Sequence, residues 1–161
     1  MSKISPCLWY KDDAEEAVNF YVSLLPDSHI DHVQRNFSGS PAGEEGTVLV
    51  IDFTLAGQTF LALNGGSHSE YTYAMSLSVD CADQAEIDRL WDAFIDGGGR
   101  PEQCGWVRDK YNVPWQIVPT MLARLMGDPD RVKGKRVMDA MLKMVKLDIA
   151  TLQAAYDGKA A

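Results

Sequence analysis

Aromatic and amide side chains on predicted strands are the residues of this sequence best suited to hold a small molecule. Trp9, Trp106 and Trp115 offer large flat apolar surfaces, and Phe60 and Asn64 share a further predicted strand. Aromatic walls with a few polar groups are typical of a ligand pocket, because the rings bury apolar surface while the polar groups fix orientation. The same side chains could equally form the core of a sheet, and the pattern alone favours neither interpretation.

Gln116 interrupts an apolar run made by Trp115, Ile117 and Val118. A buried strand favours side chains that need no hydrogen-bond partner, so a glutamine here requires an explanation. Either Gln116 lines a pocket, where its amide can donate to and accept from a ligand, or it faces solvent on a half-exposed strand.

Cysteine and histidine give weaker signals. Cys104 would be a nucleophile if a cation such as Arg108 stabilised its thiolate, but no histidine is close to it in sequence. A free cysteine is more often a small apolar side chain, and Cys104 is retained here as a candidate pocket residue. His29 and His32 form a His-x-x-His pair, but residues three apart on one strand point to opposite faces. We therefore expect no metal site from this pair.

Length, charge and cysteine content limit the function classes. The chain has 161 residues, 46% of them hydrophobic, and a formal net charge of −8. This length supports one folding unit with a sizeable core, and no window reaches the roughly 18 apolar residues of a membrane span. The negative charge repels a phosphate backbone, so we expect neither nucleic acid nor a membrane as partner. Three cysteines without a C-x-x-C pair and an N-terminus unlike a secretory signal predict free thiols and a cytoplasmic protein.

The order of predicted elements repeats along the chain. The first round has a strand through KISPCLWY, a helix that Asp12 or Asp13 caps and Pro26 ends, and strands through SHIDHVQRNF, TVLVIDFTLAG and QTFLALNGG. The second round has a strand through AMSLSVD, a helix through CADQAEIDRLWDAFIDGGG and strands through GWVRDKY and PWQIVPT. Such a repeat predicts two βαβββ modules, at about residues 1–66 and 72–120.

Residues 121–161 have the composition of a helical tail. Met138, Met141, Leu142 and Val145 recur at helical steps and form a Met-rich apolar stripe. Such a stripe either binds a partner or ligand, or packs against the protein's own sheet or a second copy, and we favour packing.

These segments resemble the vicinal oxygen chelate superfamily, the fold of glyoxalases, bleomycin-resistance proteins and extradiol dioxygenases. Within it, CLWYKDDAEEAVNFYVSLLPDS, GQTFLALNGG, SLSVDC, CGWVRDKYNVPWQIVP and the tail MLKMVKLDIATLQAAY resemble the PhnB-like branch, labelled 3-demethylubiquinone-9 3-methyltransferase. The resemblance covers nearly the whole chain. It implies an α+β fold in which two βαβββ modules form cupped mixed sheets within a single domain, residues 1–161, with a C-terminal helical extension.

The resemblance also bears on metal binding. Metal-dependent members of the superfamily draw ligands, usually His and Glu, from four equivalent places in the two modules. Those places fall here at Pro6, Leu61, Ala74 and Gln116, of which only Gln116 has a possible, weak ligand atom. The resemblance therefore implies no metal and no cofactor, and it places Gln116 in the pocket as the replacement of a lost glutamate.

Together these observations predict a metal-free protein that binds a small molecule and forms a homodimer. Open sheet edges and an apolar tail need a partner surface, and relatives commonly pair their modules across two chains. The alternative is an enzyme, either the methyltransferase of the family label or a metal-dependent isomerase or lyase. The chain has no Gly-rich strand-to-helix turn of the kind that common S-adenosylmethionine enzymes use. The candidate ligand-binding residues are Trp9, Phe60, Asn64, Cys104, Trp106, Trp115 and Gln116.

Overall fold

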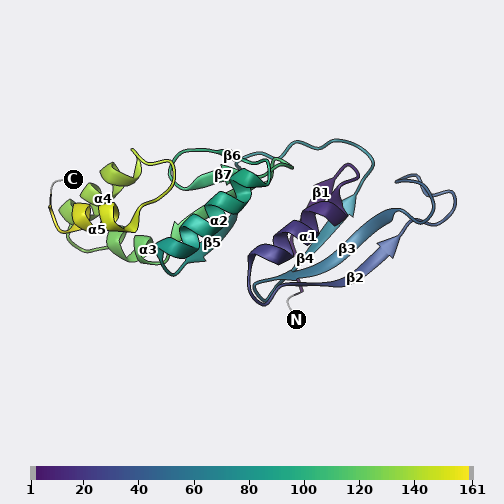
Figure 1. The fold of residues 1–161 in the computed structure, drawn as a ribbon, viewed down its shortest axis with the longest axis horizontal. Coiled ribbons are helices and arrows are strands. Elements are labelled where there is room, and N and C mark those ends of the chain that lie inside the picture. The colour runs from purple at the N-terminus through teal and green to yellow at the C-terminus, as the bar shows by residue number, and fades with distance from the viewer. Residues whose placement is uncertain (1–2, 160–161) are drawn as a thin grey trace. The chain divides into compact units, whose positions relative to one another are not determined.

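The chain divides into two compact units, Met1–Glu70 and Tyr71–Ala161, and the computed structural model describes residues 3–159. Residues 1–2 of the expected first module and residues 160–161 of the expected tail lie outside the described residues. Each unit contains one four-stranded sheet with a helix on one face, and the second unit also contains the helical tail (Figure 1). The predicted α+β class with two βαβββ modules is confirmed. That both modules form one domain stays a prediction.

The first unit has the element order expected from its hydrophobic pattern. Strand β1 pairs in parallel with β4, and β4, β3 and β2 follow as antiparallel neighbours, giving the sheet order β1-β4-β3-β2. Helix α1 supplies the crossover that a strand needs before a parallel partner can follow. The elements are β1 Cys7–Tyr10, α1 Ala14–Leu24, β2 His29–Arg35, β3 Val48–Leu55 and β4 Gln58–Asn64.

Side chains in this sheet alternate between a face covered by α1 and the opposite face, which we call the open face. Leu8 and Tyr10 of β1 are buried on the covered face, whereas Cys7 and Trp9 are exposed on the open face. The alternation follows from the two-residue period of a strand. On the covered face of β3 and β4, the buried residues include Ile51, Phe53, Leu55, Phe60 and Ala62.

The second unit repeats the plan in the order β5-β8-β7-β6, with β5 and β8 parallel. Strand β6 was not predicted, because it is only two residues long. It contains Pro101, whose missing N–H is tolerated at the edge of a sheet. The elements are β5 Leu77–Cys81, α2 Gln84–Asp96, β6 Arg100–Pro101, β7 Trp106–Arg108 and β8 Pro114–Pro119.

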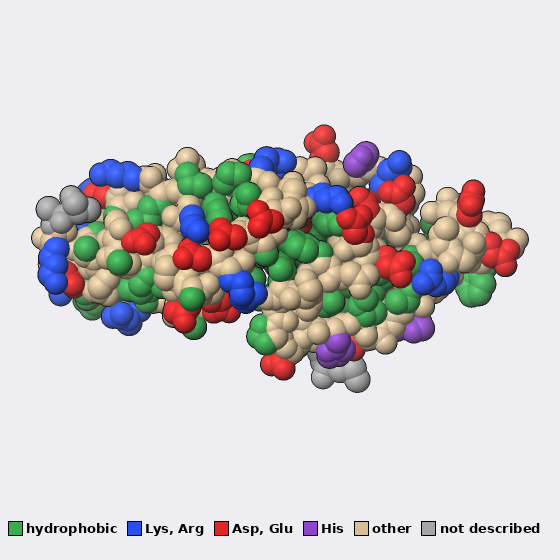
Figure 2. Space-filling view, viewed as in Figure 1, with side chains coloured by type: hydrophobic (Ala, Val, Ile, Leu, Met, Phe, Trp, Pro, Cys, Tyr) green, Lys and Arg blue, Asp and Glu red, His purple; other side chains and the backbone are tan. Residues whose placement is uncertain are grey.

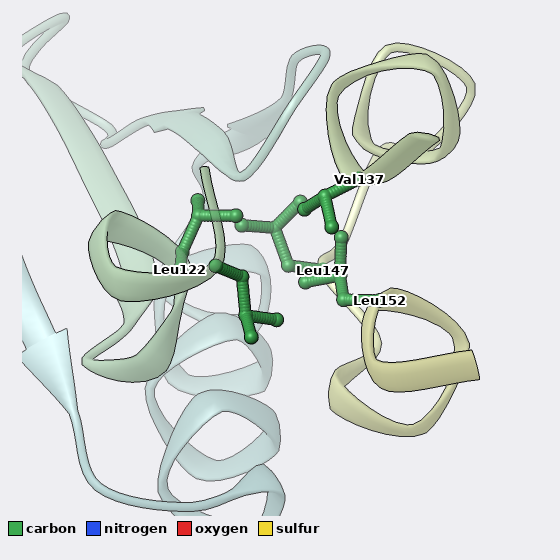
Figure 3. Packing of buried hydrophobic residues seen from close by; sticks show 5 residues of the cluster. Leu122, Val137, Leu147 and Leu152 are labelled. Carbon is green, nitrogen blue, oxygen red and sulfur yellow. The ribbon is translucent and has the colours of Figure 1, made fainter. Parts of the chain in front are cut away.

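The tail folds as three short helices, α3 Met121–Met126, α4 Arg131–Met141 and α5 Ile149–Tyr156, around a small core of its own. Leu122, Val137, Leu147 and Leu152 point toward one another in this core (Figure 3). The predicted stripe is not the buried face of the tail. Met138, Leu142 and Val145 are 40%, 57% and 40% exposed, and of the four stripe residues Met141 packs against this core. Val145 also lies beyond the end of α4, so the helical spacing does not apply to it.

The tail is anchored to the loop before β7. The backbone N–H groups of Cys104 and Gly105 donate to the carbonyl oxygens of Met144 and Val145, at 2.8 and 2.7 Å. Both loop residues have positive φ angles, +59° and +82°, which turns two successive N–H groups toward the tail.

The tail is also anchored to the start of α2. The amide of Gln84 donates to the Leu147 carbonyl at 3.1 Å and accepts from the Ile149 N–H at 2.9 Å. Lys146 pairs with Asp88 at 2.9 Å, a contact that raises the pKa of Lys146 and lowers that of Asp88. The tail is therefore held to module two by backbone and side-chain contacts at two places.

The surface carries both signs of charge. Carboxylates are distributed over the visible face, with lysines and arginines interspersed among them (Figure 2). None of the helices within residues 3–159 has the length and hydropathy that crossing a bilayer requires.

The anchoring of the tail can be tested at Gly105. A Cβ there would lie 2.9 Å from the Ile117 carbonyl oxygen and 3.0 Å from the Leu147 side chain. We expect Gly105→Ala to lower the free energy of unfolding by about 2–5 kcal/mol, through the positive φ and the overlap together. Gly57→Ala is the matched control, because Gly57 has a φ of +78° and open space around its missing Cβ. Urea denaturation compares the two, and equal losses would contradict the close approach of the tail.

Candidate functional site

Gln116 lies on the open face of the second sheet. In the register of the strands, Ser78 of β5 and Trp106 of β7 are its direct neighbours, so the three side chains share one row across that face. Trp115, next to Gln116 in sequence, is buried on the face covered by α2. Gln116 is half-buried, and its side-chain N–H donates to the Ser76 hydroxyl at 2.9 Å. The structure therefore places Gln116 on the sheet face opposite the core, beside Trp106.

A buried arginine organises the same face of the sheet. Arg108 is 6% exposed, its Nε donates to Oε1 of Glu102 at 3.1 Å, and its Nη1 donates to the carbonyls of Tyr71 and Asn112. The Tyr73 ring covers the guanidinium at 4.3 Å, and the Tyr73 hydroxyl donates to the same Glu102 oxygen at 2.9 Å. A buried charge is tolerated when it is paired and hydrogen-bonded in this way. Arg108 therefore holds the segment before β5 over the sheet.

A cavity of about 760 Å³ adjoins Trp106 at the β6 edge of this sheet. Trp106 and Tyr73 form an edge-to-face pair with ring centroids 5.8 Å apart, and Val145 brings the tail into the wall. Apolar and aromatic walls with one carboxylate are suited to a flat organic molecule. The cavity is lined by Tyr73, Pro101, Glu102, Gln103, Cys104, Trp106 and Val145.

A larger cavity, about 880 Å³, lies in the first unit between the start of α1 and the loop before β3. Its walls include the basic residues Lys11 and Arg35 and the acidic residues Glu15 and Glu44, without an aromatic ring. The walls of this cavity are more polar than those of the cavity at Trp106, which therefore fits a small organic molecule better despite its smaller volume.

Trp9 lies on the open face of the first sheet and is 36% exposed. Its ring covers Gly65, where a Cβ would come within 1.8 Å of the indole, and its Nε1 donates to the Ser67 carbonyl at 2.8 Å. The indole is therefore fixed in place by local contacts and presents part of its surface on the open face.

Phe60 and Asn64 lie on the covered face of the first sheet. Phe60 stacks on Phe53 with ring centroids 5.4 Å apart. Asn64 is 5% exposed, and its Oδ1 accepts from the Ala14 N–H while its Nδ2 donates to the Val48 carbonyl, both at 3.0 Å. Asn64 thus caps α1 from a distant strand.

The predicted cap of α1 differs from the observed one. Asp13 occupies the N-cap position but makes no capping hydrogen bond with its side chain. Its Oδ1 accepts from the Asp12 N–H at 3.3 Å instead. The structure replaces the predicted local cap with Asn64, because the buried amide reaches the first helical N–H directly.

Trp115 is part of the core of the second unit. It is 2% exposed, packs on Phe94 with ring centroids 5.0 Å apart, and donates from Nε1 to Oδ2 of Asp109 at 2.9 Å. Asp109 also accepts from the N–H groups of Tyr111 and Val113, which fixes the turn into β8. The polar end of Trp115 is therefore satisfied inside the fold.

The structure brings Cys104 and Trp106 together in one cavity and places Gln116 beside Trp106 on the neighbouring strand. It does not bring Phe60, Asn64 or Trp115 to an open face. Ligand contact by any of the seven predicted residues stays a prediction. Tyr73 and Glu102 were not predicted from the sequence, since nothing in their local pattern marks them, and Val145 was predicted only as part of the apolar stripe of the tail.

The three thiols differ in environment. Cys81 is fully buried, and burial followed by the nearby Glu86 charge raises its pKa to about 11. Because the thiolate is the reactive form, Cys81 is unreactive at neutral pH. Cys104 is partly exposed in the cavity wall, and all three cysteines are free, as predicted.

The expectation that His29 and His32 point to opposite faces is wrong. A register shift between Ile30 and His32 pairs His29 with Thr54 and His32 with Asp52, two residues of the same face of β3. The bulge inserts one extra residue and so reverses the alternation. His29 pairs with Asp31, Nε2 to Oδ1, at 3.1 Å. Within residues 3–159, no three His, Cys, Asp or Glu side chains are grouped so that they could hold a metal ion.

The four places of the expected metal site do not fit a divalent cation. Pro6 precedes β1 and accepts from the Leu61 N–H through its carbonyl at 2.9 Å. Ala74 lies in an exposed turn before β5, and the side chains of Pro6, Leu61 and Ala74 contain no ligand atom. Gln116 alone offers an oxygen, and a metal site needs three or more converging ligands.

The repeated βαβββ order, with one helix on one face of each mixed sheet, defines a protein of the glyoxalase/bleomycin-resistance fold. The model of the family described as 3-demethylubiquinone-9 3-methyltransferase matches residues 2–118. The PhnB protein from Bacillus cereus, given the same description, is 34% identical, with a TM-score of 0.65 over 74% of this chain and 100% of that chain. The chain therefore belongs to this PhnB-like family.

More distant structures share the fold alone. Protein PA1353 from Pseudomonas aeruginosa is 19% identical, with a TM-score of 0.59 over 74% of this chain and 98% of that chain. The fosfomycin resistance protein FosX from Listeria monocytogenes, in complex with Mn(II) and sulfate, is 16% identical, with a TM-score of 0.52 over 78% and 96%. No curated protein matches this chain. The family match ends at residue 118, so helices α3 to α5 lie beyond it.

The structural role of Asn64 can be tested by substitution. Asn64→Ala leaves the buried Ala14 N–H and Val48 carbonyl without partners, and each loss costs about 1–3 kcal/mol. We expect a fall in the free energy of unfolding of about 2–4 kcal/mol, measured by urea denaturation. Asn19→Ala is the control. Asn19 is an exposed residue of α1, and its side-chain N–H donates to the Glu15 carbonyl of the same helix. An Asn64→Ala protein as stable as this control would contradict the capping role.

Proposed function

We propose that this PhnB-like chain is a metal-free homodimer that binds a small organic molecule on the open face of its second sheet. The observation that carries the proposal is the row formed by Ser78, Gln116 and Trp106 on that face. It sets an amide, which can donate and accept, beside an indole that can stack on a flat molecule. Trp115, the neighbour of Gln116 in sequence, is instead buried under α2.

The chemistry of the four expected metal places supports binding without a metal. Three of them hold carbon side chains, and the fourth, Gln116, already directs its amide N–H to Ser76. An amide that hydrogen-bonds within the protein is oriented for recognition of a ligand group by its remaining oxygen. The side chains at these four places therefore supply no ligand set for a metal ion.

The methyltransferase of the family description is the second candidate, and the local structure does not favour it. Each module passes from its first strand to its helix through a short turn, residues 11–13 in the first and 82–83 in the second. These turns contain no glycine and are acidic, whereas a common S-adenosylmethionine site has a glycine-rich turn at this position. Methyl transfer would require a binding mode of another kind.

Dimer formation has two supports. Strands β2 and β6 are the last strands of their sheets, and such edges are open to pairing with another chain. The tail also exposes Met138 and Leu142, which are 40% and 57% accessible in the single chain. Apolar side chains at such exposure are suited to an interface between two copies.

Native mass spectrometry of freshly purified protein, with metal analysis of the same sample, tests this proposal. We expect a dimer mass, no stoichiometric divalent metal, and a melting temperature that neither EDTA nor S-adenosylmethionine changes. A small organic adduct that mild denaturation releases would supply the mass of the ligand. One metal ion per chain, a monomer, or a rise of several degrees with S-adenosylmethionine would each contradict the proposal, because specific binding stabilises the folded state.

A further inference from the structure

The cavity beside Trp106 contains a buried acceptor without a partner. Oε1 of Glu102 accepts from Arg108 and from Tyr73, whereas Oε2 is buried and no described group donates to it. Nearly all buried polar atoms in folded proteins are paired, so an unpaired carboxylate oxygen indicates a missing partner. Glu102 lines the cavity and its side chain is 18% exposed, so a molecule bound there would contact this residue.

The charge of Glu102 is already balanced. The side chain of Arg108 is 7% exposed, and its Nε lies 3.1 Å from Oε1 of Glu102, so the two opposite charges cancel within the pair. The Arg108 guanidinium also occupies the face of the Tyr73 ring. A cationic ligand would therefore bring an unmatched charge and compete with Arg108, whereas a neutral N–H or O–H group supplies what Oε2 lacks.

The walls define the rest of the ligand. Trp106 and Tyr73 meet edge to face, which leaves flat apolar surface toward the cavity. Tyr73 is 62% exposed and its hydroxyl contacts the same carboxylate, so a displacement of this side chain would admit a ligand group to Glu102. A planar, uncharged body with one donor at its edge matches this arrangement.

Val145 closes the cavity on the tail side. Its position is fixed by the bond from the Gly105 N–H to the Val145 carbonyl and by the neighbouring bond from Cys104 to Met144. This wall comes from the helical tail, which lies beyond residues 2–118 of the family match. Val145 therefore limits the cavity on the tail side.

We propose that the cavity lined by Trp106, Glu102 and Val145 selects neutral, planar aromatic molecules that carry a hydroxyl or N–H donor, with Glu102 as the acceptor and the C-terminal extension as a wall. This inference rests on the proposed function and names the ligand class of that face at its β6 edge, where Trp106, unlike Gln116 and Ser78, lines the cavity. It assigns a binding role to Glu102 and a limit on ligand size to Val145.

The experiment compares two matched probes by isothermal titration calorimetry on the full chain. 2-Naphthol carries a hydroxyl donor, and 2-methoxynaphthalene has the same ring system without one. We expect 2-naphthol to bind at least about tenfold more tightly, the effect of one hydrogen bond to a charged group. In Glu102→Gln, which keeps an acceptor toward Arg108 and presents N–H at the Oε2 position, we expect the preference to fall to within about twofold.

The location is tested with Val145→Phe, which enlarges the tail-side wall and narrows the cavity, against Val132→Phe, the same change at a 63% exposed residue of α4 outside the cavity wall. We expect Val145→Phe to weaken both probes by at least about tenfold and Val132→Phe to leave them unchanged. If Glu102→Gln does not fold, the probe pair on the unmodified chain and the Val145→Phe comparison decide alone.

The outcomes separate the two proposals. Equal binding of both probes by the unmodified chain, with loss in Val145→Phe, would overturn the selection of a donor while leaving a small-molecule site in place. Tight binding by a charged naphthylmethylammonium probe in place of 2-naphthol would overturn the neutral ligand class. Binding that Val145→Phe leaves intact would overturn the location, and no binding by any of these aromatic probes would count against the proposed function as well.

Discussion

Each four-stranded sheet of this protein has a helix on only one of its faces, and the distribution of most strand side chains follows from that constraint. Residues on the covered face enter the core, as Trp115 and Phe60 do. Residues on the open face stay partly accessible, as Gln116 and Trp106 do, unless a local contact covers them, as the Tyr73 ring covers Arg108. The two-residue period of a strand thus turns neighbours in sequence into residues with different functions. Gln116 stands in an apolar run because Trp115 and Ile117 point to the covered face whereas Gln116 points to the open face.

The open face of the second sheet is organised by a buried charge rather than by apolar packing. Arg108 needs an anion and several acceptors, and it obtains them from Glu102, from backbone carbonyls and from the face of Tyr73. Those contacts bring the segment before β5 onto the sheet and create a cavity wall opposite Trp106. The tail supplies a further wall through Val145, which the Gly105 N–H holds in position. The contacts that pair the charge of Arg108 therefore also shape the cavity, and the unpaired atom Oε2 belongs to Glu102, the carboxylate that pairs with Arg108.

The periodic features of the fold were predictable from the sequence. The repeated strand and helix order and the helical nature of the tail follow from hydrophobic spacing. Features that depend on distant partners were not predictable. Asn64 caps α1 from 50 residues away, and the bulge beside Asp31 places both histidines of the His-x-x-His pair on one face. Strand β6 is too short to produce a pattern.

The candidate site was predictable to a similar extent. Trp106 and Gln116 could be identified as candidate site residues, because a large aromatic ring and an amide within predicted strands stand out in the sequence. That the two are neighbours depends on the register of β7 with β8, which the sequence does not give. Glu102 looks ordinary in sequence and acquires its role through Arg108. Val145 belongs to the apolar stripe expected for the tail, but its place beside the cavity comes from the docking of the tail, which no local pattern indicates.

The central claim is that a small molecule is held beside Trp106 and Gln116 on the open face, and the most direct measurement is a nuclear magnetic resonance titration of the ¹⁵N-labelled protein with 2-naphthol. The four indole N–H signals belong to Trp9, Trp91, Trp106 and Trp115, of which Trp91 and Trp115 are buried. The account predicts that the Trp106 indole and the Gln116 side-chain amide shift together and saturably, while the signals of Trp91 and Trp115 stay in place. Shifts confined to Trp9 or to the buried indoles, or no saturable shift at Trp106, would contradict it.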